Sequence, residues 1–176
     1  MQPRQIPRSS SFRSPGPSRC SGAVGQARRL CRRNRSGVKE SIDGNSQSPS
    51  LTDAFSHLIA QIAITPPGAR LAAISGQVAI DKSGQLIGGN DHAAQAKRCF
   101  GNVLNALAAM KADPKDILQM KIYVVRHSAD LVPAIFSAGA DIFGEKWPVC
   151  ASTWIGVEAL AMPEWLVEIE VLVAVP

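Results

Sequence analysis

The C-terminal run LVEIEVLVAV, residues 166–175, decides the fold because apolar and acidic residues alternate along it. Successive side chains of a β-strand point to opposite faces, so Glu168 and Glu170 would share one face of the predicted strand. The other face carries the apolar residues Val167, Ile169, Val171 and Val173. This alternation predicts a strand with one apolar face.

Two helices and two further strands are predicted just upstream. The strands span 117–125 and 151–157, and the helices span 91–112 and 130–143. Asp91 is a good N-cap for the first helix, and Asp113-Pro114 ends it. The apolar residues of that helix recur at spacings of three and four and form one stripe, namely Ala96, Cys99, Phe100, Val103, Leu107 and Met110.

Nearer the N-terminus, residues 58–64 and 70–75 have the composition of strands and flank the break Pro66-Pro67-Gly68. We predict a hairpin with a loop longer than two residues, followed by a short strand at 77–80. The order β-β-β-α-β-α-β-β predicts an α+β two-layer sandwich, with one mixed β-sheet and two helices on one face. The other face, with Ile169, Val171 and Val173, would be bare and would need a partner subunit.

The first 50 residues differ in composition from the rest. They hold ten basic residues against two acidic ones, a net charge of +8, whereas residues 51–176 hold nine against twelve, a net charge of −3. Residues 1–50 are therefore expected to be a disordered basic tail before a domain at 51–176. Three interpretations of the tail stay open, which are translation from a start codon assigned too early, a mitochondrial presequence and an RNA-binding arm.

The composition excludes several classes of protein. The four cysteines are scattered and form no pair with metal-ligand spacing, so neither a disulfide scaffold nor a zinc site is expected. No apolar run approaches the length of a membrane span, and no secretory signal is visible. We therefore expect a cytoplasmic protein, or a mitochondrial one if residues 1–50 are a presequence. Because the positive charge belongs to the tail, we do not expect nucleic acid to be the partner of the fold.

Several short motifs resemble one family in their order and spacing. They are Ile74-Ser75-Gly76-Gln77, the turn at 81–84, Gln95, Lys121-Ile122-Tyr123-Val124-Val125, Ser152-Thr153, Gly156-Val157 and Val167-Glu168-Ile169-Glu170. Over residues 56–175 the chain resembles the YjgF/YER057c/UK114 family, also called the Rid family.

This resemblance implies a chorismate-mutase-like fold and a homotrimer with the sheets packed at its centre. Ligand sites would lie between neighbouring subunits. The best-studied relatives are deaminases that hydrolyse reactive imine and enamine metabolites, such as 2-iminobutanoate, to a 2-oxo acid and ammonia. They use no metal or organic cofactor. Older labels in the family include translation inhibitor and endoribonuclease.

The resemblance also assigns site residues. Glu168 stands at the acid/base or water-positioning position, whereas Glu170 has no such match and is expected to be structural. Ser75 and Gly76 match residues that line the pocket at a strand end. Thr153 matches the hydroxyl residue that follows an arginine in the deaminating relatives.

The sequence departs from the family pattern at that arginine. Ser152 stands in its place, Trp154 follows two residues later, and Phe136 replaces an asparagine of the second helix. Without the arginine, binding of a substrate carboxylate should weaken about ten- to a hundredfold or more. Arg70 or Arg126 could supply the charge from elsewhere.

Two functions therefore stay open for the folded part. One is a hydrolase for imines or enamines with altered substrate preference. The other is a non-catalytic trimer that binds a small metabolite. Trp154 would be a flat wall for a ligand in either case, or else part of the core or of an interface.

Overall fold

The computed structural model describes residues 44–47, 52 and 54–175. Its main sheet has the strand order β2-β6-β5-β7-β4. The bounds are β2 (Ile59–Ala60), β4 (Arg70–Val78), β5 (Ile117–Val125), β6 (Cys150–Val157) and β7 (Val167–Val175). β6 is parallel to both β2 and β5, whereas β7 is antiparallel to β5 and β4, so the sheet is mixed as predicted.

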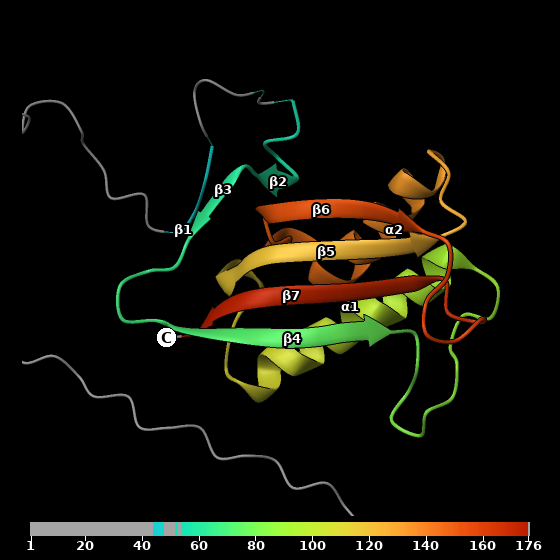
Figure 1. Ribbon diagram of the computed structural model, residues 1–176. Coiled ribbons are helices and arrows are strands. Elements are labelled where there is room, and N and C mark those ends of the chain that lie inside the picture. The colour runs from blue at the N-terminus through green and yellow to red at the C-terminus, as the bar shows by residue number, and fades with distance from the viewer. Residues whose placement is uncertain (1–43, 48–51, 53, 176) are drawn as a thin grey trace, which may run out of the picture. The chain divides into compact units, whose positions relative to one another are not determined.

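Two helices, α1 (His92–Ala109) and α2 (Leu131–Phe143), pack against each other on one face of this sheet (Figure 1). Short 3-10 helices at Pro114–Asp116 and Gly144–Lys146 precede β5 and follow α2. The α+β sandwich with both helices on one face is confirmed. No described helix is long and apolar enough to cross a membrane.

Helix α1 begins where the sequence predicts. The Asp91 carboxylate accepts hydrogen bonds from the backbone N–H groups of Ala93 and Ala94, at 2.8 and 3.1 Å, and so caps the helix. Five of the six predicted stripe residues, Ala96, Cys99, Phe100, Val103 and Leu107, are completely buried. The helical periodicity therefore identified the residues that face the sheet.

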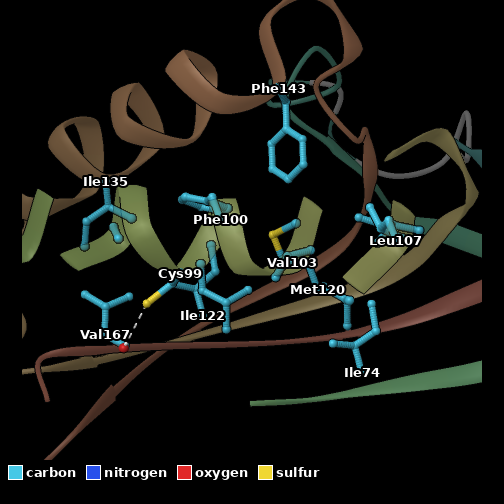
Figure 2. Close-up of a cluster of buried hydrophobic side chains, with 14 of the residues drawn as sticks. Ile74, Cys99, Phe100, Val103, Leu107, Met120, Ile122, Ile135, Phe143 and Val167 are labelled. Carbon is cyan, nitrogen blue, oxygen red and sulfur yellow. Dashed lines mark hydrogen bonds between the residues drawn. The ribbon is translucent and has the colours of Figure 1, made fainter. Parts of the chain in front are cut away.

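These α1 residues form the centre of the core, between the helices and the strands (Figure 2). Phe100 meets Phe143 of α2 edge to face, with ring centroids 5.7 Å apart. The Cys99 thiol donates a hydrogen bond to the carbonyl of Val167, at 3.3 Å. Burial raises the pKa of Cys99 to about 12, so this thiol is a packing group rather than a nucleophile.

The apolar face of β7 is covered, which corrects the expectation that it would be bare. Ile169, Val171 and Val173 are buried in the core under the helices. The opposite, open face carries Glu168 and Glu170 instead. Alternation groups the residues of a strand into two faces, but the helices cover the apolar one because that burial stabilises the fold most.

The predicted hairpin of 58–64 with 70–75 is wrong. Ile59 and Ala60 pair with Cys150 and Ala151 of β6, at the edge of the sheet opposite to β4. β3 (Ile62–Ile64) pairs with β1 (Gly44–Ser46) in a separate two-stranded sheet. The predicted short strand at 77–80 is also not separate, because β4 continues to Val78 through an irregularity between Ile74 and Gln77.

Strand β1 lies inside the segment that was expected to be a disordered tail. Its backbone pairs with β3, and the Asn45 amide donates a hydrogen bond to the carbonyl of Ile117, at 3.0 Å. Backbone pairing needs no apolar side chains, which is why composition did not indicate this strand. Ordered structure therefore begins before residue 51, and the rest of the predicted tail, 1–43 and 48–50, lies outside the described residues.

Gln95, one of the family-like residues, is a structural clamp. It is completely buried, and its side chain donates to the carbonyls of Gly89 and Glu164, at 2.6 and 2.9 Å. Its carbonyl oxygen accepts from the N–H of Leu166, at 2.8 Å. Gln95 thereby ties the start of α1 to the loop that leads into β7.

Candidate functional site

The Glu168 carboxylate lies directly over Gly76. Glu168 pairs with Val78 of β4 beyond the register irregularity, so its side chain reaches back across the neighbouring strand. A Cβ atom at position 76 would overlap the carboxylate oxygen Oε1 and lie 2.8 Å from Cγ of Glu168. Only glycine leaves room for the carboxylate at this place.

The environment of Glu168 favours its protonated form. Burial of the half-buried carboxyl raises its pKa above the ordinary value, and the negative charge of Glu170 raises it further. A raised pKa brings a carboxyl closer to the pH at which it can both donate and accept a proton, as a general acid and base must. The geometry thus brings together the predicted residues Glu168 and Gly76.

Glu170 is held differently, by an ion pair with Lys121 of the adjacent strand. Its Oε1 lies 2.6 Å from Nζ of Lys121, and the two residues are direct partners across β5 and β7. The hydrogen bond and the charge of Glu170 raise the pKa of Lys121. This pairing agrees with the expectation that Glu170 is structural. Ser75 lies beside the pair, in a hollow of about 180 Å³.

A second group of predicted residues surrounds a cavity of about 390 Å³, which we call the Trp154 pocket. Its residues are Ile59, Ile122, Val132, Phe136, Ser152, Thr153 and Trp154. The volume lies within the range of pockets for small molecules. The structure therefore gathers all four predicted residues from β6 and α2, namely Ser152, Thr153, Trp154 and Phe136.

Aromatic rings form the wall of the Trp154 pocket. Phe136 stacks on Trp154 with 5.9 Å between ring centroids and 16° between ring planes. The indole Nε1 of Trp154 donates a hydrogen bond to Nδ1 of His127, at 3.2 Å. Trp147 packs behind Phe136, with 5.4 Å between centroids. Contacts on several sides hold the indole in one orientation.

The two groups lie on opposite faces of one sheet, except for the side chain of Thr153, which lies opposite Lys121 of β5 and shares the open face. Ile122 of β5 pairs with Trp154 and with Ile169, and these three residues lie on the helix side. The next residue, Tyr123, pairs with Glu168, and its side chain therefore points to the open face. A single small ligand cannot touch both groups within one chain.

Neither candidate arginine lines the Trp154 pocket. Arg70 lies at the start of β4, the edge strand farthest from β6. Arg126 follows β5 with a left-handed φ of 51°, and its guanidinium donates a hydrogen bond to Oδ1 of Asn90, at 2.8 Å. The charge missing at Ser152 is not replaced within this chain by either residue.

Sequence reasoning did not select several contributors to these groups. Val132 lines the pocket, His127 accepts the indole hydrogen bond of Trp154, and Lys121 forms an ion pair with Glu170. Only Lys121 had a signal, because a lysine in a strand is expected to face an acid of the neighbouring strand. Among the described residues, no three of the types His, Cys, Asp and Glu gather in a way that could hold a metal ion.

Comparison with known proteins identifies the family of the chain. The model of the endoribonuclease L-PSP family matches residues 48–175. The structure of YyfB from Yersinia pestis, a protein of unknown function of the conserved Rid family, has a TM-score of 0.67 with 31% sequence identity. The match covers 74% of this chain and 96% of that one.

Two Escherichia coli structures share the fold at lower identity. The YjgF gene product has a TM-score of 0.52 and 20% identity, over 77% of this chain and 98% of that one. TdcF with bound serine has a TM-score of 0.52 and 17% identity, over 78% and 98%. A comparison with curated proteins gives no significant match. By the family model and the Yersinia structure together, this chain belongs to the endoribonuclease L-PSP family, that is, the Rid (YjgF/YER057c/UK114) family.

Proposed function

We propose that the protein hydrolyses reactive imine or enamine metabolites, with Glu168 as the general acid and base. The observation that carries the proposal is the position of this carboxyl over Gly76, where burial raises its pKa. Membership of the Rid family adds support. Ser152 in place of the family arginine supports a substrate preference different from that of the 2-imino acid deaminases.

The reaction adds water across a C=N bond and releases ammonia. In its protonated form, Glu168 donates a proton to the imine nitrogen, which makes the carbon more electrophilic. The resulting carboxylate accepts a proton from the attacking water as the new C–O bond forms. Glu168 then transfers that proton to the amino group, the C–N bond breaks, and Glu168 takes back the hydroxyl proton as the C=O bond forms. The products are a carbonyl compound and ammonia, Glu168 is protonated again, and no cofactor takes part.

We further propose that the active unit is a homotrimer in which the two groups of site residues come from neighbouring subunits. Support comes from their placement on opposite faces of the sheet within one chain. Light scattering on the full chain should give three times the monomer mass. A monomer mass would overturn the trimer.

Ammonia release from enzymatically generated imines tests the reaction. Glu168→Gln should lower the rate by roughly 10²–10⁴, the usual contribution of a positioned acid or base. Glu170→Gln is the matched control, because it makes the same change on the same face of the same strand, and its effect should be much smaller. Equal effects of both changes would refute the special role of Glu168.

Mixed trimers test the shared site. Glu168→Gln subunits and Trp154→Leu subunits, each inactive alone, should regain activity when mixed, because about a quarter of the interfaces then combine two intact halves. No recovery would refute a site that is shared between neighbouring subunits. Absence of ammonia from every imine, together with ligand binding, would instead favour a non-catalytic trimer that binds a small metabolite.

We expect this activity in the cytoplasm. Cys99 and Cys150 are both free thiols, as a reducing compartment allows. Microscopy of the full chain with a C-terminal fluorescent protein tests this, and a mitochondrial signal would instead support the presequence interpretation of the tail.

A further inference from the structure

We infer that the Trp154 pocket selects an uncharged, planar aromatic compound with an N–H group, and discriminates against carboxylates. The inference names the substrate class of the proposed hydrolase, and so depends on that function for its biological meaning. Its physical basis is the lining of the pocket, which combines aromatic and aliphatic walls with one small polar group.

The first argument is charge. None of the described residues that line the pocket is Lys, Arg, His, Asp or Glu. An ionised carboxylate that enters an apolar site without a cation loses its hydration and gains no ion pair. A neutral ligand has no such cost. In the proposed trimer, the Glu168 side chain of a neighbouring subunit would disfavour an anion further whenever it is ionised.

The second argument is shape. Phe136 and Trp154 are nearly parallel, and the hydrogen bond from Trp154 to His127 holds the indole in place. A flat ring can stack on this wall, whereas the aliphatic side chains of Ile59, Ile122 and Val132 suit its edges. An aliphatic 2-imino acid would use little of this surface.

The third argument is the direction of the available hydrogen bond. The Ser152 hydroxyl donates to the carbonyl of Cys150, at 3.2 Å, and the Cys150 thiol lies 3.5 Å from its oxygen. Since a hydroxyl oxygen has two lone pairs, at least one remains to accept from a ligand. The indole N–H of Trp154 is already used by His127. Thr153 lies opposite Lys121 in the pairing of β6 with β5, so its side chain points to the open face of the sheet and away from the pocket. The side chains of the pocket thus offer an acceptor, which matches the N–H of a neutral imine, amine or amide.

Benzamide and benzoate form a matched pair of probes, because they share one ring and differ in charge and in N–H groups. Titration calorimetry on the full chain at neutral pH should show benzamide binding at least about ten times more tightly than benzoate. Ser152→Ala should weaken benzamide about three- to tenfold. Ser152→Arg should reverse the preference by supplying a cation.

Controls separate the pocket from the rest of the chain. Trp154→Leu should weaken benzamide, whereas Trp165→Leu, a tryptophan outside the pocket, should not. Binding of neither probe, or equal or tighter binding of benzoate, would overturn the inference. Benzoate binding that Arg70→Ala abolishes would overturn it too and would identify a neighbouring Arg70 as the missing cation.

Failure of this inference and failure of the proposed function have different signatures. Preference for benzamide without ammonia release from any imine would leave the ligand class intact and refute the hydrolase. Ammonia release from 2-iminobutanoate together with preference for benzoate would leave the hydrolase intact and refute the ligand class.

Discussion

Gly76→Ala should inactivate the protein without unfolding it. The new methyl group would occupy the place of the Glu168 carboxylate, with Cγ only 2.8 Å away. The atoms nearest to this methyl group belong to the flexible side chain of Glu168 and not to the backbone, so the carboxylate can rotate away toward solvent. Gly76 is not among the described glycines with positive φ, so alanine can adopt its backbone conformation.

The stability change should be small because two effects oppose each other. Replacing glycine where alanine fits stabilises the fold by about 0.4–1 kcal/mol through the entropy of the unfolded chain. Clearing the new methyl group costs about 0.5–1.5 kcal/mol where it leaves a χ angle of Glu168 away from its staggered value. The net change should lie within about 1 kcal/mol, which corresponds to a few degrees in Tm for a domain of this size.

The effect on Glu168 should be large by comparison. In solvent the carboxyl loses the burial that raises its pKa, so its pKa should fall toward the ordinary glutamate value. Titration of the glutamate side-chain carbons by NMR measures this shift without a substrate. Ammonia release should fall about as far as in Glu168→Gln, roughly 10²–10⁴. The double variant Gly76→Ala with Glu168→Gln should release ammonia almost as fast as either single variant, because both changes remove the same catalytic group.

Two results would refute this reasoning. Full activity of Gly76→Ala beside an inactive Glu168→Gln would mean that the carboxylate works from another position. An unchanged pKa of Glu168 in Gly76→Ala would mean that the contact with Gly76 does not keep the carboxyl out of solvent.

Three further predictions concern the same residues and their support. Since the pKa of Glu168 is raised in the folded state, the folded protein binds this proton more tightly, and stability falls as pH rises through that pKa. Glu168→Gln should therefore be at least as stable as the parent at neutral pH, with the difference in Tm vanishing in acid, and a larger difference in acid would contradict this sign. Ser152→Arg should raise kcat/KM for 2-iminobutanoate by about one to two decades, as a hydrogen bond to a charged group allows. If this variant forms a folded trimer with only background activity, the missing arginine is not what separates the protein from its deaminating relatives. Gln95→Leu leaves three backbone groups unpaired and should cost about 3 kcal/mol in urea unfolding, whereas a loss below about 1 kcal/mol would show that water replaces the amide.

Local patterns were sufficient for most of the secondary structure. The spacing of apolar residues identified α1 and the residues it buries, and Asp91 marked its start, because both depend on contacts within a few residues. The alternation in β7 likewise separated Glu168 from Ile169. These properties follow from the geometry of a single helix or strand, which a linear sequence displays directly.

Pairing between distant segments was not visible in the same way. Ile59 lies beside Cys150 rather than beside β4, although the chain turns at Pro66-Pro67-Gly68 as a hairpin would. The packing of the whole sheet determines which strand lies parallel to Ile59–Ala60, and the residues near Ile59 carry no local signal for that pairing.

The same distinction between local pattern and long-range pairing applies to the candidate site. Residue identities, with the family resemblance, were enough to select Glu168, Gly76, Ser152 and Trp154. Their side chains fall into two groups only because β5 lies between β6 and β7, and each one-residue step along β5 changes the face. The register of β5 against its two neighbours, a property of the assembled sheet, therefore decides that Trp154 and Glu168 lie on opposite sides.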